Sequence, residues 1–318
     1  MLNFLTERSP AINSLRVQNN NISQASRSVL AALLLLPWLS SCVSLFRGGP
    51  GDDIPTCNSG CMTGKEFISK TSRLSTRGRE QVIRTQLTQG NIPGFLRDLQ
   101  PVTTSMGRGS QRITGKFWVM PDYLALGTEE DFVRIPMNPI TAQYIASRYG
   151  FVLPSKKMVD LIYRQAGIHL SPAPLKAGPA MTGNQYYRRH NAMISRQIPR
   201  GSYEHTLVAG HKKDVVVSNR LIRKPRSVAI YGWHRGNGRP IQPLSTVHGN
   251  TYADYSHGIR LVYRLMKVDG ETREVRDVMA DPILWRLLSD EGPLRVTAYN
   301  TRTLISAKEA AGTLARSP

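Results

Sequence analysis

Residues 259–270 read IRLVYRLMKVDG, a run of aliphatic and aromatic residues that ends in the pair Asp269-Gly270. Such a run predicts a strand, and an Asp-Gly pair predicts a tight turn after it. Two further runs, 214–218 (DVVVS) and 227–233 (SVAIYGW), predict strands by the same rule. The second half of the chain is therefore predicted to be rich in β-sheet.

The first half carries helix signals. Asn138-Pro139 places a capping residue before a proline at the first helical position, and Ser155 is a second capping residue. Three helices are predicted, over 76–89, from Asn138 to about Tyr149, and from Ser155 through Gln165. Short strands are expected within 116–127 and over 131–136, a polar loop over 102–112, an extended loop over 171–186, and, late in the chain, a short helix over 282–288 and a final strand over 294–299. The predicted fold class is α+β, with helices in the first half and mainly antiparallel β-sheet in the second half.

The N-terminal region carries an export signal. Residues 27–42 read RSVLAALLLLPWLSSC, a basic residue followed by an apolar run of about ten residues. Such a run is shorter than the ~20 residues that a membrane span needs, and it is typical of a signal peptide. The end of the run, Leu39-Ser40-Ser41-Cys42, resembles the bacterial lipobox. That resemblance implies cleavage before Cys42, a lipid on Cys42 and a membrane-anchored lipoprotein.

These signals divide the chain. Residues 1–41 are interpreted as a leader, 42–60 as a tether rich in Gly, Pro and Asp, and 61–318 as a single α+β domain, with a helical part over 61–170 and a β-rich part over 200–300 as a possible subdivision. Cys57 and Cys61 remain after Cys42 is assigned to lipid. An exported protein tolerates disulfides, so a bond between these two is favoured over free thiols.

The formal net charge of +20 and the pI near 10.3 concentrate anionic partners at the surface. For a chain outside the cytoplasm the candidates are peptidoglycan, acidic polysaccharide and anionic lipid, and no nucleic acid is expected. An equally good interpretation of this charge is that the arginines and lysines only keep the protein soluble.

The histidines indicate where chemistry takes place. All seven lie between His169 and His257, and four fall within 211–257, each near a predicted strand end or a turn. Those four are His211, His234, His248 and His257, and two carboxylates, Asp214 and Asp254, belong to the same stretch.

One hypothesis for this region is a zinc site. Imidazoles and a carboxylate suit Zn²⁺, which activates a bound water for hydrolysis. The ligands would come from His211, Asp214, His234 and His248, with Asp254 and His257 as further candidates. The spacing of His248 and Asp254 is similar to that of a histidine and an aspartate in zinc D,D-carboxypeptidases.

A second hypothesis needs no metal. Residues 252–257 (YADYSH) bring several hydrogen-bonding side chains together for general acid–base work. The proposed catalytic residues are His248, Tyr252, Asp254, Tyr255 and His257, with Ser256 as a structural hydroxyl. Arg260, Arg235 and Trp233 are predicted to bind substrate, the arginines through a carboxylate and the indole through a sugar face. Lys212 and Lys213 are interpreted as solvated charges.

The stretch Ser256-His257-Gly258-Ile259-Arg260 is similar to the Ser-His-Gly-Cys-Ile-Arg signature of L,D-transpeptidases, and His248-Gly249 is similar to that family's His-Gly pair. The nucleophilic cysteine is missing, because Gly258 passes directly to Ile259. The covalent mechanism of that family needs the thiol. No membership is inferred.

Phosphate-binding and dinucleotide-binding glycine motifs are absent from the sequence. The favoured function is an exported hydrolase that acts on a peptide or glycan bond of a cell-envelope polymer, with Zn²⁺ as the one cofactor considered. The alternatives are a non-catalytic module that binds an anionic envelope polymer and a lyase that acts on an acidic polysaccharide.

Overall fold

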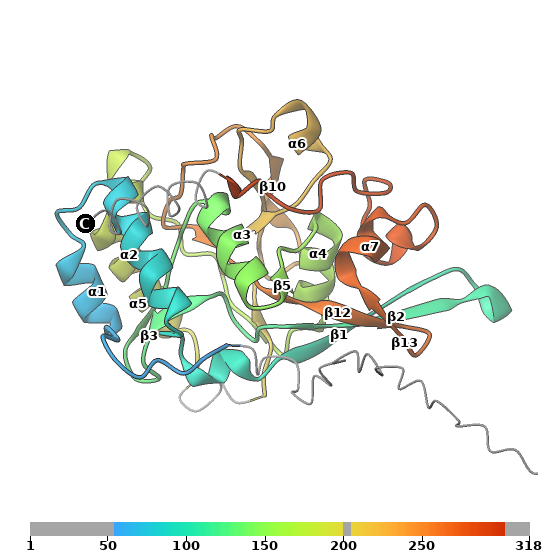
Figure 1. Ribbon diagram of the computed structural model, residues 1–318, viewed down its shortest axis with the longest axis horizontal. Helices are drawn as coiled ribbons and strands as arrows, with labels where there is room; N and C mark the ends of the chain where they lie inside the picture. The colour runs from blue at the N-terminus through green and yellow to red at the C-terminus, as the bar shows by residue number, and fades with distance from the viewer. Residues whose placement is uncertain (1–53, 200–204, 303–318) are drawn as a thin grey trace, which may run out of the picture. The chain divides into compact units, whose positions relative to one another are not determined.

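The computed structural model describes residues 54–199 and 205–302, which are built around a five-stranded sheet (Figure 1). Its strands follow the order β1-β2-β12-β13, and β5 pairs with β12. All of these pairs are antiparallel. The strands are β1 (Gln100–Met106), β2 (Ile113–Val119), β5 (Phe151–Val152), β12 (Val262–Val268) and β13 (Glu271–Glu274).

A second sheet has the order β10-β9-β8-β11 and carries His234 and His257 in its strands. Its last pair, β8 with β11, is parallel. The strands are β8 (Lys213–Val216), β9 (Ala229–His234), β10 (Pro240–Ser245) and β11 (His257–Gly258). Two small pairs complete the strands: β3 (Ala125–Gly127) with β4 (Phe132–Arg134), and β6 (Ile168–His169) with β7 (Val208–Ala209).

The longer helices lie between residues 64 and 195, and side-chain caps start several of them. Thr63 and Glu66 form a capping box, and Ser75, Asn138 and Ser155 each accept a backbone N–H of the first turn. The helices are α1 (Gly64–Lys70), α2 (Thr76–Thr88), α3 (Pro139–Arg148), α4 (Lys156–Gln165) and α5 (Asn184–Ser195), followed by the short α6 (Arg220–Arg223) and α7 (Val275–Ala280). Short 3₁₀ helices span Gly94–Arg97, Gly109–Gln111, Pro179–Thr182 and Leu284–Leu287.

Most helices and both larger sheets share one large apolar core, and a small second cluster includes Ile194 of α5 and Val208 of β7. Helix α4 contacts β1 of the first sheet and β9 of the second, so it joins the two sheets, and α2 packs beside α3 (Figure 1). Met158 and Ile162 of α4 are buried in this core, and so are Phe117 of β2 and Met266 of β12. The predicted α+β class is confirmed, with helices mainly in the first half and antiparallel sheets in the later half.

Several predicted elements are wrong, and each error has a local cause. Residues 102–112 are not simply a loop, because β1 occupies their first half: Val102 and Thr104 point inward and the residues between them point outward. The alternation of inward and outward residues was hidden because serine and threonine are polar, although threonine is β-branched and suits a strand. Helix α5 begins within the predicted 171–186 loop. Residues 294–299 form no strand.

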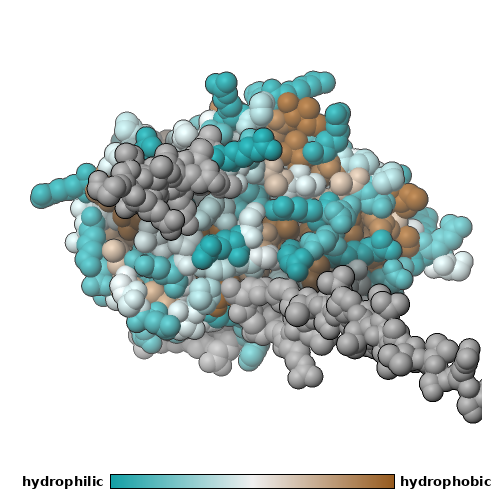
Figure 2. Space-filling view, in the orientation of Figure 1, coloured by the Kyte–Doolittle hydropathy of each residue, from teal (hydrophilic) through white to brown (hydrophobic). Residues whose placement is uncertain are grey.

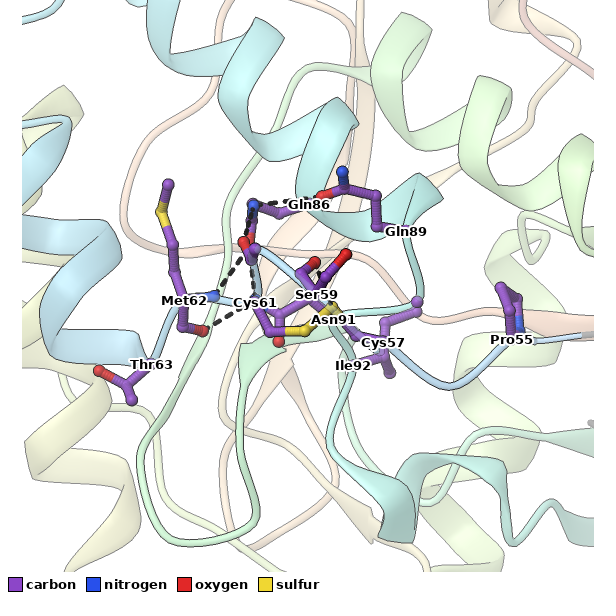
Figure 3. Close-up of a disulfide and its surroundings, with 12 residues drawn as sticks. Pro55, Cys57, Ser59, Cys61, Met62, Thr63, Gln86, Gln89, Asn91 and Ile92 are labelled. Carbon is purple, nitrogen blue, oxygen red and sulfur yellow. Dashed lines mark hydrogen bonds between the residues drawn. A yellow bond between two sulfur atoms is a disulfide. The ribbon is translucent and has the colours of Figure 1, made fainter.

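The described chain begins with a segment that packs on the domain. Ile54 is buried, and Arg97 donates from Nη2 to the carbonyl of Pro55 at 2.8 Å. Cys57 and Cys61 form a disulfide, and Gln86 and Asn91 of the neighbouring helix and loop bind the backbone around it (Figure 3). The leader and Cys42 lie outside the described residues. Within the described ranges no helix is long and apolar enough to cross a membrane.

The face visible in Figure 2 is mostly hydrophilic, with hydrophobic residues in separate small groups. Large apolar side chains with substantial exposure are few in the described part of the chain. They are Leu74, Ile222, Ile241, Val247 and Ile283.

Candidate functional site

The Asp254 carboxylate is the centre of a buried hydrogen-bonded group. Its Oδ1 accepts the Ser256 backbone N–H at 2.8 Å and the Ser256 hydroxyl at 2.5 Å. Its Oδ2 accepts the Tyr252 hydroxyl at 3.0 Å and lies 4.0 Å from Nε2 of His257. Residues within one short segment thus surround a single carboxylate. We call Tyr252, Asp254, Ser256 and His257, together with His248, the Asp254 cluster.

The backbone explains why this group forms. Asp254 accepts the N–H two residues on, which is an Asx turn, and the turn places Tyr252 and Ser256 on the same carboxylate. The chain then enters β11, where His257 pairs in parallel with Lys213 of β8. A Cβ at Gly258 would lie 2.6 Å from Tyr123 Cδ1, so only glycine lets β11 approach this closely.

Burial and charge set the protonation of the cluster. Burial raises the pKa of Asp254, but His257 and the Ser256 hydrogen bonds outweigh it and hold that pKa below its usual range. Burial lowers the pKa of His257 to about 4, which keeps this imidazole neutral at pH 7. Burial and the Asp254 charge raise the pKa of Tyr252 to about 12. At pH 7 Asp254 is therefore a carboxylate, His257 a neutral imidazole and Tyr252 a protonated phenol.

His248 and Tyr252 connect the buried carboxylate to the surface. The His248 imidazole is exposed and stacks on the half-buried Tyr252 ring, with ring centroids 4.1 Å apart and planes 17° apart. Tyr252 in turn meets His257 edge-on at 5.7 Å. An imidazole that reaches the surface can act as a general base or acid, and Tyr252 supports it from below while its hydroxyl donates to Asp254. The arrangement is suited to general acid–base chemistry at the surface end of the cluster.

Tyr255 does not join the cluster. It is buried, and its hydroxyl accepts the backbone N–H of Leu175 at 2.7 Å. Its carbonyl accepts Nζ of Lys212 at 2.7 Å. Lys212 is fully buried, not a solvated charge, and burial lowers its pKa to about 7. The His190 ring lies 5.0 Å from the Tyr255 ring and has no hydrogen-bond partner among the described residues.

His211 and Asp214 belong to a different buried network. His211 Nε2 lies 3.0 Å from Asp122 Oδ1, and Asp122 Oδ2 forms an ion pair with Arg134 at 2.7 Å. The Tyr123 hydroxyl donates to Asp214 at 2.8 Å. Burial lowers the pKa of His211 to about 4 and raises that of Asp214 to about 6. These contacts join the turn after β2 to the start of β8.

His234 has a third set of partners. Its Nε2 lies 3.1 Å from Asp160 Oδ1, which also accepts the Tyr231 hydroxyl at 2.8 Å. The His234 ring stacks on Tyr163 at 4.4 Å. Asp160 and Tyr163 both belong to α4, so this group fastens the helix to the end of β9.

The four histidines that the sequence brought together are thus divided among three groups of partners. In the described ranges no three His, Cys, Asp or Glu side chains gather as metal ligands. The hypothesis that His211, Asp214, His234 and His248 bind zinc is consequently supported only by the sequence pattern.

The predicted substrate-binding residues have different surroundings. Arg260 is fully buried and donates to the carbonyls of Met120 and Val208, so it holds core segments together. Trp233 is 6% exposed, has a positive φ of 59°, and lies under Nζ of Lys213 at 5.1 Å. Arg235 is exposed at the turn after β9. Of the three, only Arg235 presents its side chain to solvent.

Sequence reasoning missed Asp122, Arg134, Asp160 and His190. Asp160 lies in an amphipathic helix, where the sequence pattern indicates a surface charge. Asp122 follows a proline, where the pattern indicates a turn residue. Neither position is close in sequence to the histidine that it contacts. No pattern within a short window could have paired them.

Comparisons with family models, with curated proteins and with solved structures found no match. The functional argument therefore rests on the residues and their geometry.

Proposed function

We propose that this chain is an exported hydrolase that cleaves a peptide or glycan bond in a cell-envelope polymer at the Asp254 cluster. One observation supports this most: a buried carboxylate accepts the hydroxyl of Tyr252, and the Tyr252 ring stacks on an exposed imidazole, His248. Buried charge is expensive to maintain, and side chains arranged in this way are frequent in catalytic sites.

The residues take the following roles in this proposal. His248 removes a proton from the attacking water and returns it to the leaving group. Tyr252 holds the His248 ring in place by stacking, because the one proton of its hydroxyl is donated to Asp254. Asp254 is a positioning residue, because it holds Tyr252, Ser256 and His257 in place and does not reach the surface itself.

Export is supported by two features. The lipobox-like stretch that ends at Cys42 supports lipid anchoring, and the disulfide between Cys57 and Cys61 is of the kind that persists in oxidising compartments. The net charge of +20 supports an anionic polymer as substrate.

The test uses the soluble form that starts after Cys42. Peptidoglycan and acidic-polysaccharide fragments are incubated with it, and new amino or reducing ends are counted. Release by the wild type that His248→Ala abolishes would support the proposal. His205→Ala is the matched control, since His205 is exposed and remote in sequence from the cluster. Equal activity of His248→Ala and the wild type would refute the site.

The lyase alternative predicts a different product. Elimination leaves a carbon–carbon double bond that absorbs in the ultraviolet, whereas hydrolysis leaves none. Absorbance that rises together with reducing ends would replace the hydrolase by a lyase. Absence of any cleavage, with metal supplied and withheld, would leave binding as the activity of this chain.

A further inference from the structure

A groove with a strongly positive lining follows strand β1 and the neighbouring parts of β2, β12 and α4. Its volume is about 650 Å³. The strands that carry it are labelled at one end of the sheet in Figure 1. We call it the β1 groove. Its charged lining residues are Arg112, Lys116, Lys157, Arg164, Lys267 and Asp269.

Most of the cations of the β1 groove have no counter-charge among the described residues, while Lys157 donates to the Arg286 carbonyl and interacts with the charge of Asp290. Among the described residues none of the five pairs with a carboxylate, whereas nearby Lys156 pairs with Asp160 and Asp290. The one acidic lining residue, Asp269, is occupied, since its Oδ1 accepts the backbone N–H and the hydroxyl of Thr114. The groove therefore carries a net positive charge available to a ligand.

Two of the lysines stand directly opposite each other. Lys116 of β2 and Lys267 of β12 are register partners, and both are exposed. Like charges at such positions are destabilising, because their Cβ atoms are only about 5 Å apart. Lys267 donates to the Thr272 hydroxyl, which does not neutralise it. An anion that lies across the two strands would relieve this repulsion.

An aromatic residue adjoins the same lysine pair. Trp118 is two residues from Lys116 along β2, so both side chains lie on the same face of the sheet. Its ring is half-buried, and Nζ of Lys116 is 5.4 Å from the ring centroid. A flat indole face beside cations suits a sugar ring that bears a carboxylate, since the ring stacks and the carboxylate meets the lysines. A bare lipid headgroup offers no such ring.

We infer that the β1 groove binds an acidic polysaccharide, with Lys116 and Lys267 contacting its carboxylates and Trp118 stacking on a sugar ring. This site shares no residue with the Asp254 cluster, and the inference does not depend on hydrolysis. Several cations spread over β2, β12, α4 and the turn before β2 suit a polymer with repeated charges better than a single small anion.

The test measures binding of a fluorescent oligogalacturonate to the His248→Ala soluble form by anisotropy, at several salt concentrations. Affinity should fall as salt rises. The double variant Lys116→Gln/Lys267→Gln should bind roughly fivefold to tenfold more weakly, with a shallower dependence on salt. Lys65→Gln/Lys70→Gln on α1 is the matched control, because it removes the same charge from exposed positions outside the groove.

A loss of binding by the double variant cannot be attributed to loss of folding. Removal of the opposed lysines relieves repulsion, so the double variant should unfold at the same temperature as the parent or higher. Equal losses in the groove variant and the control would mean attraction by net charge alone and would overturn the inference. Because the parent already lacks His248, binding is measured whether or not the proposed hydrolysis exists.

Trp118→Leu separates a sugar from a simple anion. It should weaken oligogalacturonate binding and leave inorganic polyphosphate binding unchanged. Vesicles of phosphatidylglycerol and phosphatidylcholine test the membrane as the occupant. If they bind through Lys116 and Lys267 while oligogalacturonate does not, the groove is a membrane-contacting surface and the polysaccharide assignment is wrong.

Discussion

The Ser256 hydroxyl lies 2.5 Å from Oδ1 of Asp254, and neither residue is exposed by more than 2%. In this arrangement the serine donates to a carboxylate and is directed away from solvent. Ser256 therefore acts on Asp254, and its contribution to catalysis is expected through the carboxylate's pKa.

The pairing predicts a shift in pH dependence. Ser256→Ala removes a hydrogen bond to the charged form of Asp254, so the pKa of Asp254 rises towards its ordinary value. The acid limb of the kcat/KM profile should move to higher pH, with little change at pH 8. Asp254→Asn should lower kcat by roughly a hundredfold above the acid limb and should remove that limb from the profile. A profile of Ser256→Ala that coincides with the wild type would contradict this link.

The two histidines of the Asp254 cluster should respond differently to alanine. His248 is exposed, so His248→Ala should change unfolding free energy by less than about 0.5 kcal/mol while activity falls by roughly a hundredfold. His257 is fully buried, and His257→Ala leaves a cavity that should cost about 2 kcal/mol or more. Urea denaturation and activity assays on the same preparations distinguish the two.

Glu80 predicts a pH-dependent stability. Burial raises the pKa of Glu80 to about 7, although Thr141 and Asn138 donate hydrogen bonds to it. Between pH 4.5 and 7 the folded state binds more protons than the unfolded state, so this group's contribution to stability is greatest below pH 4.5 and is lost as pH rises through 7.

Glu80→Gln cannot ionise, and it should therefore exceed the wild type in stability by about 2–3 kcal/mol at pH 8 and match it near pH 4.5. Urea unfolding at the two pH values measures this. An equal difference at both pH values would show that packing, not ionisation, separates the two proteins.

The disulfide should matter locally. Cys57 and Cys61 are separated by four positions in sequence, so the chain-entropy effect of the bond is about 2 kcal/mol at most. Gln86 and Asn91 hold the same turn by hydrogen bonds to Gly60 and Met62 (Figure 3). Cys57→Ser/Cys61→Ser should lower the unfolding free energy by no more than that amount. Loss of folding altogether would show that the bond has a larger role.

The sequence that ends at Cys42 predicts that the protein is attached to the membrane. The lipobox-like stretch implies a lipid on this residue, although Cys42 lies outside the described residues. In cells, Cys42→Ala should move the protein from the membrane fraction to a soluble one, and Cys57→Ser/Cys61→Ser should leave it in the membrane. Both proteins in the same fraction would remove the argument for lipidation.

The sequence by itself determined the elements whose signals are local. Capping residues and a proline correctly predicted α3 and α4, and apolar runs correctly predicted β8, β9 and β12. These signals suffice because caps and side-chain periodicity act within a few residues. The group of Tyr252, Asp254 and Ser256 was also visible, since one turn of the backbone brings them together. Strand β1 was not predicted, because its threonine and serine residues make that stretch of sequence polar.

Only the tertiary structure decided which charged groups meet. His211 contacts Asp122 and His234 contacts Asp160, partners 89 and 74 positions away in sequence. Strand pairing likewise places Lys116 opposite Lys267, which forms the centre of the β1 groove. Burial of Arg260 and Lys212 depends on the same long-range packing. Such contacts follow from how the sheets and α4 assemble, and no short window of sequence records that assembly.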